Sequence, residues 1–179
     1  MVSAAIGDVW IMAANALVCL GGVAMDLEDY REAESHLEQG LRWYEELERG
    51  GYPWSVAYAC TRLGEVALST QDYPKAQHWL QQSLGYLHQA GREPDRLYYE
   101  ALLDVAKLFA AQARTEDAVE ILSCLSHIEY SPQDQFISDL ATASLVELQS
   151  SLPGEIYMAA LERGKALYLD TVDAKFLET

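Results

Sequence analysis

Apolar residues recur along the chain with helical spacing, and short breaker segments divide them into stretches of regular length. Such stretches predict amphipathic helices, because side chains three or four residues apart share one face of a helix. Runs that alternate between polar and apolar residues, which would predict strands, are absent from the sequence. The pattern predicts eight helices, over about residues 6–25, 30–48, 53–69, 73–91, 94–112 and 115–128, then from 131 and over 155–170.

Acids, glycines and prolines mark the expected helix ends. An acid or hydroxyl before a helix accepts hydrogen bonds from its free N–H groups, and glycine after it adopts the left-handed conformation easily. The expected N-caps are Asp29, Asp72 with Pro74 in the first turn, Thr115, and Asp134 as the acid of a capping box. The expected breaks are Gly50-Gly51, Gly91 and Pro153-Gly154.

Two stretches of the chain are closely similar, LGGVAMDLEDYREAESHLEQGL over 20–41 and LGEVALSTQDYPKAQHWLQQSL over 63–84. Their offset is 43 residues, and small residues continue the period through later units. One pair of antiparallel helices cannot bury both apolar faces, whereas stacked pairs can. Small side chains at the recurring positions predict close contact between paired helices. The expected packing residues are Gly21, Ala33, Gly64, Ala76, Ala106, Ala118 and Ala160.

The repeated signature resembles the tetratricopeptide repeat, with Leu-Gly on a first helix, Tyr at the turn, and Ala and a large apolar residue on a second helix. The matching residues are Leu20-Gly21, Tyr30, Ala33 and Leu37, and again Leu63-Gly64, Tyr73, Ala76 and Leu80. The resemblance implies an all-α fold, a right-handed α-solenoid of about four hairpins. The period exceeds the usual value of about 34 residues, which lengthens the helices. Gly164 replaces the leucine expected in the fourth unit, as fits a divergent capping unit.

Residues 41–84 and 151–172 are also similar to repeat arrays at the C-terminal ends of large bacterial signalling regulators. Those proteins join a switch ATPase to a DNA-binding or kinase domain. The resemblance implies a fragment of such a transcriptional or signalling regulator, forming a single domain over 1–179. The expected units are approximately 6–50, 51–92, 93–130 and 131–170.

Charge and composition restrict the partners. The formal net charge is −16, from 28 acidic and 12 basic residues, which has the wrong sign for direct binding to nucleic acid or anionic membranes. The acids form a solvated face or repel wrong partners. The N-terminal apolar stretch lacks a basic segment and contains Asp8 and Asn15, so we expect a buried helix there. Cys19, Cys60 and Cys124 form no CxxC pair, which favours a reducing, cytoplasmic setting.

The sequence contains no constellation typical of an enzyme. It has no glycine-rich phosphate loop, no nucleophile elbow, and no histidine pair spaced to bind a metal. We therefore expect a non-enzymatic chain without cofactor or metal. Glu32 and His36 are four residues apart and can pair on a helix surface. Trp54 and Tyr58 share one helix face, where they either pack or contribute to a binding cage.

The resemblance implies that the first helix of each hairpin lines a concave groove holding a protein or peptide partner. The positions carried over as groove residues are Asn15, Val18, Gly22, Met25, Tyr58, Thr61, Arg62, Glu65, Leu68, Glu100, Leu103, Asp104, Lys107, Leu145 and Gln149. A clamp for a peptide carboxylate is disfavoured, because Val18, Gly22, Glu100 and Asp104 stand where cations would be required.

Three functions are consistent with these features. The chain is an interaction scaffold that binds a peptide or helix in its groove, a sensor of a small-molecule effector within a switch ATPase, or a self-association module. The last would use the first helix, which carries few charges, to form a homo-oligomer.

Overall fold

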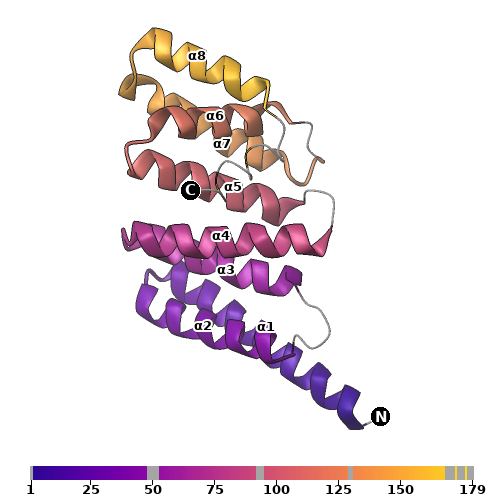
Figure 1. Cartoon of the computed structure of the whole chain (residues 1–179). Helices are drawn as coiled ribbons and strands as arrows, with labels where there is room; N and C mark the ends of the chain where they lie inside the picture. Colours follow the sequence, from indigo (N-terminus) through magenta and orange to yellow (C-terminus); the bar gives the residue numbers. More distant parts are fainter. Residues whose placement is uncertain are drawn as a thin grey trace. The chain divides into compact units, whose positions relative to one another are not determined.

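The computed structural model describes residues 2–47, 53–91, 95–128 and 131–167, together with positions 172 and 176. All regular structure in these ranges is helical, and the expectation of eight α-helices without strands is confirmed for them. The elements are α1 (Val2–Asp26), α2 (Tyr30–Leu47), α3 (Pro53–Ser69), α4 (Tyr73–Ala90), α5 (Arg96–Ala111), α6 (Thr115–His127), α7 (Gln135–Leu148), a 3₁₀ turn η2 (Gln149–Ser151) and α8 (Gly154–Lys165) (Figure 1).

The chain divides into two compact units, unit 1 over residues 1–92 and unit 2 over residues 93–179. Unit 1 contains α1 to α4, and unit 2 contains α5 to α8. This boundary coincides with the expected boundary between the second and third hairpins. The arrangement of the whole chain as one right-handed solenoid stays a prediction.

Unit 1 consists of two antiparallel hairpins, in which α1 packs on α2 and α3 packs on α4, while α3 also packs on α2 (Figure 1). Glycines permit the close approach within each hairpin. A Cβ atom at Gly21 would lie 2.6 Å from Cγ of Leu37, and one at Gly64 would lie 2.8 Å from Cδ2 of Leu80. Real Cβ atoms do not approach carbon so closely, so both positions require glycine. Gly21 and Gly64 therefore lie at the contact between the paired helices.

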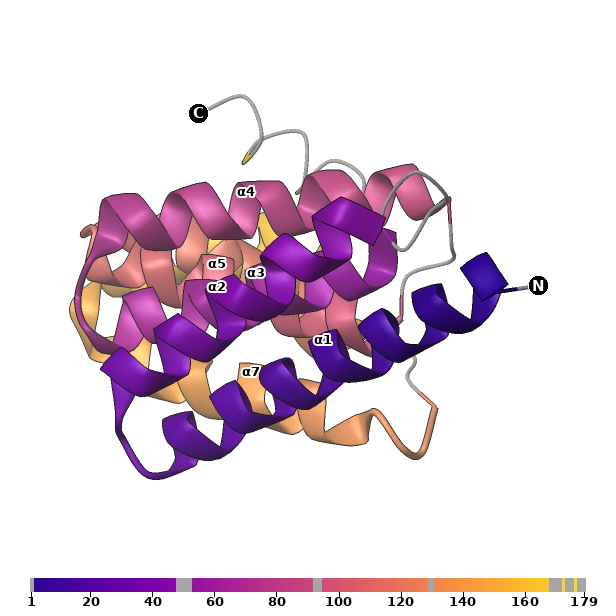
Figure 2. The ribbon, with the colours of Figure 1, turned by 90° about the horizontal axis from the view of Figure 1, so that it is seen from below.

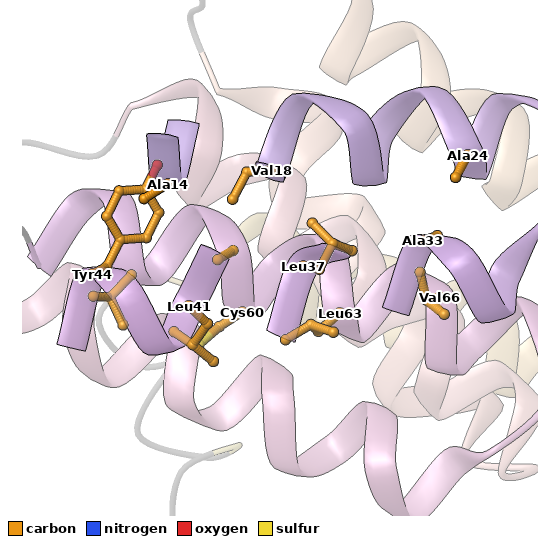
Figure 3. Close-up of a cluster of buried hydrophobic side chains, with 12 residues drawn as sticks. Ala14, Val18, Ala24, Ala33, Leu37, Leu41, Tyr44, Cys60, Leu63 and Val66 are labelled. Atoms are coloured by element: carbon orange, nitrogen blue, oxygen red, sulfur yellow. The ribbon is translucent and has the colours of Figure 1, made fainter. Parts of the chain in front are cut away.

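The core of unit 1 lies between α1, α2 and α3. Leu37, Leu41 and Tyr44 extend from α2 into this core, where they meet residues of both first helices (Figure 3). Trp10 and Trp43 add an edge-to-face contact between α1 and α2, with ring centroids 5.0 Å apart. The expected packing alanines Ala33 and Ala76 are fully buried. Because the apolar side chains of α2 are shared, the two hairpins form one packed unit.

The turn between the two helices of a hairpin has the same backbone structure three times. Glu28, Gln71 and Ala113 each adopt a left-handed conformation, with φ of 58°, 61° and 60°. The following N–H group then donates across the turn, as from Asp29 to the carbonyl of Ala24 at 2.9 Å, an arrangement that closes a helix C-terminus. The sequence predicted a break at each of these places but not the left-handed conformation, because glycine is absent from all three positions.

Unit 2 departs from the hairpin pattern at its last helix. α6 packs on α5, α7 and α8, so the main helix contact of α8 is with α6 and not with α7. A Cβ atom at Gly164 would lie 2.6 Å from Cβ of Ser123, and Ser123 Oγ donates to the carbonyl of Leu161 at 2.8 Å. Nε of Arg163 lies 2.6 Å from Oε1 of Glu120. The glycine that replaces the expected leucine is therefore required for the contact of α8 with α6.

The predicted helix ends that fall on described residues are correct in unit 1 and only partly correct in unit 2. Asp29 accepts from the N–H of Glu32 at 3.0 Å, and Asp72 accepts from the N–H of Lys75 at 3.2 Å. Gly91 closes α4 with φ of 59°. The Gly50-Gly51 break lies outside the described residues. Asp95, which was not predicted as a cap, accepts from the N–H of Tyr98 at 3.3 Å.

Two predicted caps in unit 2 are wrong. Thr115 is the first residue of α6 and not its cap, because the N-cap position is taken by Arg114 without a side-chain hydrogen bond. α7 begins at Gln135 and not at Ser131, and Asp134 makes no capping bond. Instead Ser131 Oγ donates to Oδ2 of Asp134 at 2.7 Å. The local bond between the two side chains replaces the expected capping box.

The expectation that the N-terminal helix is buried holds for one face of α1 only. Ala14, Val18 and Ala24 are buried against α2, whereas Leu20 and Val23 are half exposed. By length and composition alone, the stretch Val9–Asp26 is apolar enough to span a membrane, and 22% of it is buried in the structure.

Candidate functional site

The first helices of unit 1, α1 and α3, lie side by side and supply the candidate binding face. Most of the groove positions predicted on these two helices are accessible. Asn15 is exposed, and Gly22, Met25, Tyr58, Arg62, Glu65 and Leu68 are partly exposed. The structure therefore brings these seven residues to one pair of neighbouring helices.

A continuous stripe of aromatic and charged side chains runs along α3. The rings of Trp54 and Tyr58 are stacked, with centroids 5.8 Å apart and planes inclined by 7°. The guanidinium of Arg62 lies over the ring of Tyr58, 5.1 Å from its centroid. Glu65 holds Arg62 through an ion pair of 2.7 Å. We call Trp54, Tyr58, Arg62 and Glu65 the α3 stripe.

Helical spacing explains the order within the α3 stripe. Successive members are four, four and three residues apart, so they fall on one face of α3. Stacking and cation–π contacts hold the side chains extended along that face. The expectation that Trp54 and Tyr58 share a face is confirmed. The stripe can offer a flat apolar surface beside a fixed hydrogen-bond donor.

A buried phenol lies behind this face. Tyr44 of α2 donates from its hydroxyl to Oδ1 of Asn15 on α1. Burial raises the pKa of Tyr44 to about 12, and the nearby Cys19 and Tyr58 raise it further. The hydroxyl therefore stays protonated at neutral pH and works as a structural donor that fixes Asn15.

Two predicted groove residues of unit 1 are buried inside the hairpins and present no surface to a partner. Val18 packs against Gly40, where an added Cβ would lie 2.8 Å from Cγ2 of Val18. Thr61 is fully buried and shares a hydrogen bond of 2.7 Å with Ser83. Both residues face the second helix of their own hairpin, so their role is packing.

In unit 2 three further groove predictions fall on buried positions, Leu103, Asp104 and Leu145. Asp104 pairs with Lys107 at 2.7 Å within α5. The accessible predicted residues are Glu100, Lys107 and Gln149. Glu100 is held by Arg96 at 2.7 Å, so it belongs to a pair and does not stand alone.

A small cleft in unit 2 has a volume of about 100 Å³ and contains one of the predicted residues, Lys107. Its other lining residues are Ala106, Ala110, Leu122, Ser144, Glu147 and Leu148. Sites for drug-sized ligands usually measure roughly 300–1,000 Å³. The cleft can hold part of a side chain but not a typical metabolite, which disfavours an effector site at this place.

The described residues contain no cluster of three or more His, Cys, Asp or Glu side chains placed to hold a metal ion. Glu32 and His36 form the predicted surface pair, with Oε1 and Nε2 3.4 Å apart. Burial raises the pKa of Cys60 to about 12, and the charge of Glu45 raises it further, so this thiol is not a nucleophile at neutral pH.

Repeated helical hairpins closed by the same turn define a helical-repeat protein, in agreement with comparisons to known families. Residues 12–84 match the family model of the tetratricopeptide repeat. This stretch is therefore identified as tetratricopeptide repeat, and it covers both stretches whose similarity first indicated the repeat. The match covers less than half of the chain and lies wholly in unit 1. No curated protein and no solved structure gives a match to the chain.

Tetratricopeptide repeats are typically non-catalytic scaffolds, and they generally bind protein partners.

The burial of Val18 and Thr61 was not predicted from the sequence, although the sequence contains a signal for it. Val18 and Thr61 are equivalent at the offset of 43 residues, as are the residues that face them, Gly40 and Ser83. Small residues opposite each other in both copies indicate contact within the hairpin and not a free surface.

Proposed function

We propose that unit 1 is a protein-interaction module that binds a peptide or helix across α1 and α3. The observation that carries this proposal is the α3 stripe, in which Trp54 and Tyr58 stack and Arg62 covers Tyr58. Aromatic and arginine side chains dominate the binding energy of protein interfaces. A stripe held in place before binding loses little conformational entropy when a partner arrives.

The neighbouring helix α1 extends the proposed face. Gly22 has no atom within 4 Å of an added Cβ, so the backbone of α1 is open to a partner there. Met25 and Leu68 are equivalent positions at the offset of 43 residues, and both are partly exposed. The face therefore combines apolar side chains, an open backbone and one arginine, which suits a segment with apolar side chains and a hydrogen-bond acceptor.

The test begins with peptides selected on the wild-type chain from a displayed random library. Their dissociation constants are measured by fluorescence anisotropy for wild type, Tyr58→Ala and Arg62→Glu. We expect each substitution to weaken binding by about tenfold or more, as is usual for the loss of an interface anchor. Circular dichroism should show unchanged helix content, because both side chains are partly exposed.

Matched controls carry the same kind of change on second helices. Arg42→Glu reverses an exposed arginine on α2, and Gln82→Ala truncates an exposed residue on α4. Neither should alter the affinity. Equal affinities for wild type, Tyr58→Ala and Arg62→Glu would refute the proposal for the α3 stripe.

We further propose that this module acts in the cytoplasm, within a bacterial transcriptional or signalling regulator. The support is the resemblance of residues 41–84 and 151–172 to regulator repeat arrays, and the presence of free cysteines at Cys19, Cys60 and Cys124. The test is the sequence of the complete gene. An adjoining switch-ATPase domain is the expected result, and a gene that encodes the repeats alone contradicts it.

A further inference from the structure

The outward side of α1 carries a row of apolar side chains that unit 1 leaves exposed or only partly covered. Leu20 is 50% exposed and Val23 is 55% exposed, and the row continues with Ala13, Ala16 and Leu17. In Figure 2 no helix of unit 1 lies in front of α1. We call Ala13, Ala16, Leu17, Leu20 and Val23 the α1 outer face.

The second hairpin shows what such a face contacts when it is covered. The equivalents of the five residues, 43 positions later, are Val56, Ala59, Cys60, Leu63 and Val66. All five are apolar and at most 3% exposed, and they belong to the core that α2 shares with α3 (Figure 3). The two faces have nearly the same side chains, so the α1 outer face repeats a surface that already receives a helix.

The α1 outer face differs from the proposed peptide face. Asn15, Gly22 and Met25 lie nearly half a turn away around α1, given roughly 100° per residue. The hairpin side of α1 is occupied by α2 through Val18 and Ala24. α1 thus has one covered side, one candidate peptide side and one uncovered apolar side.

We propose that the α1 outer face is a docking site for an amphipathic helix that packs on α1 as α2 packs on α3. In the existing contact, Leu37, Leu41 and Tyr44 of α2 share one buried core with Cys60, Leu63 and Val66 of α3. The spacing of four and three residues along α2 gives the occupant its pattern. The occupant therefore carries large apolar residues at this spacing on one face.

An ion pair in the existing contact indicates the charge of the occupant. Lys75 at the start of α4 pairs with Glu34 of α2. The residue equivalent to Lys75 at the start of α2 is Glu32, which is an acid and exposed. The sign is reversed, so the helix docked on α1 should carry lysine or arginine where α2 has Glu34. The acidic net charge of the chain favours such a partner over another acidic one.

A second copy of this chain fits the site poorly. The α2 side chains Leu37 and Leu41 of a second copy are buried between its own α1 and α3, so its α2 is not available as the docked helix. Two copies with a net charge of −16 each also repel. An anionic lipid surface is disfavoured by the exposed acids Asp26, Glu28 and Asp29 at the end of α1.

The probe is a synthetic peptide with the sequence of residues 30–47 and the change Glu34→Lys, labelled for fluorescence anisotropy. We expect saturable binding to the whole chain. Leu20→Glu should weaken this binding about tenfold or more, because it places a charge where the docked peptide would bury the leucine. Leu140→Glu is the matched control, since Leu140 is a half-exposed leucine of α7 in unit 2, and it should bind as wild type. The unmodified peptide should bind several-fold more weakly at low salt.

Leu20→Glu should keep the thermal midpoint of wild type, because Leu20 is already half in solvent. Absence of binding, or equal weakening by Leu20→Glu and Leu140→Glu, overturns the proposal. So does an apparent mass that rises with concentration and falls on Leu20→Glu, which would assign the face to a second copy, or co-sedimentation with phosphatidylcholine vesicles, which would assign it to lipid. Tyr58→Ala should leave this binding unchanged, so its outcome is separate from that of the peptide face.

Discussion

Gly64 of α3 lies so close to Leu80 of α4 that a Cβ atom at Gly64 would come 2.8 Å from Cδ2 of that leucine. The same relationship joins Gly21 and Leu37, 43 residues earlier. Both leucines are fully buried and cannot move aside cheaply. The helix spacing in each hairpin of unit 1 therefore depends on one missing methyl group.

Gly64→Ala is expected to destabilise the chain by about 1–3 kcal/mol, the usual cost of an overpacked core. Gly85→Ala on α4 is the control, because an added Cβ there meets nothing within 4 Å. It should stabilise by about 0.5–1 kcal/mol, as alanine favours a helix over glycine. Urea denaturation followed by circular dichroism measures both, and equal effects of the same sign would contradict this account.

Gln71→Gly is expected to stabilise the chain by up to about 1 kcal/mol. Gln71 adopts φ of 61°, a conformation that costs a residue with a side chain about 1–2 kcal/mol. Glycine removes this cost, but its greater flexibility in the unfolded chain offsets part of the gain. Gln82→Gly, the same change within α4, should instead destabilise by about 1 kcal/mol. Thermal melting shows the two shifts, and a lower midpoint for Gln71→Gly would refute the strain at this turn.

Thr61→Val is expected to reduce stability by about 1 kcal/mol without weakening peptide binding. Thr61 is fully buried and shares a hydrogen bond of 2.7 Å with Ser83, and each hydroxyl also bonds the carbonyl of Ala57 at 3.0 Å. The double variant with Ser83→Ala should cost less than the sum of the single changes, since both remove one shared bond. If Thr61→Val instead weakens peptide binding and leaves stability unchanged, Thr61 belongs to the binding face.

Stability should fall as the pH rises from about 9 to 12. Burial raises the pKa of Cys60 from 9.0 to about 12 and that of Tyr44 from 10.0 to about 12. In that interval the unfolded chain loses these protons while the folded chain keeps them, so deprotonation favours unfolding. Denaturation midpoints at pH 8, 9.5 and 11 measure this loss of stability. In Tyr44→Phe, the loss of stability above pH 10 should be smaller than in wild type. Midpoints independent of pH would contradict the burial of both groups.

The repeat spacing predicted the hairpins of unit 1 because the required residues lie at a fixed distance in the sequence. Gly21 and Gly64 recur with their leucines, and a missing side chain opposite a large one is a clear signal. The N-caps at Asp29 and Asp72 were also predicted, since an acid before a helix has one dominant role. These features are local or periodic, and both kinds can be found in one sequence.

Other features depend on contacts that local patterns do not contain. Thr115 looks like a cap, but the turn that contains Ala113 places the N-cap one residue earlier, at Arg114. Leu103, Asp104 and Leu145 occupy first helices as groove residues would, yet they are buried. For these three residues the helix was predicted correctly, whereas the side of the helix depends on neighbours far away in the sequence; Gln149, expected on the same helix as Leu145, lies in η2.

The left-handed turns at Glu28, Gln71 and Ala113 have a consequence for evolution. The same bend is made with an acid, an amide and a methyl side chain, so no single amino acid is obligatory at that point. Copies of an ancestral hairpin could accumulate substitutions there and still close in the same way. The bend at residue 113 therefore has the same backbone conformation as the two bends within the family match, which ends at residue 84.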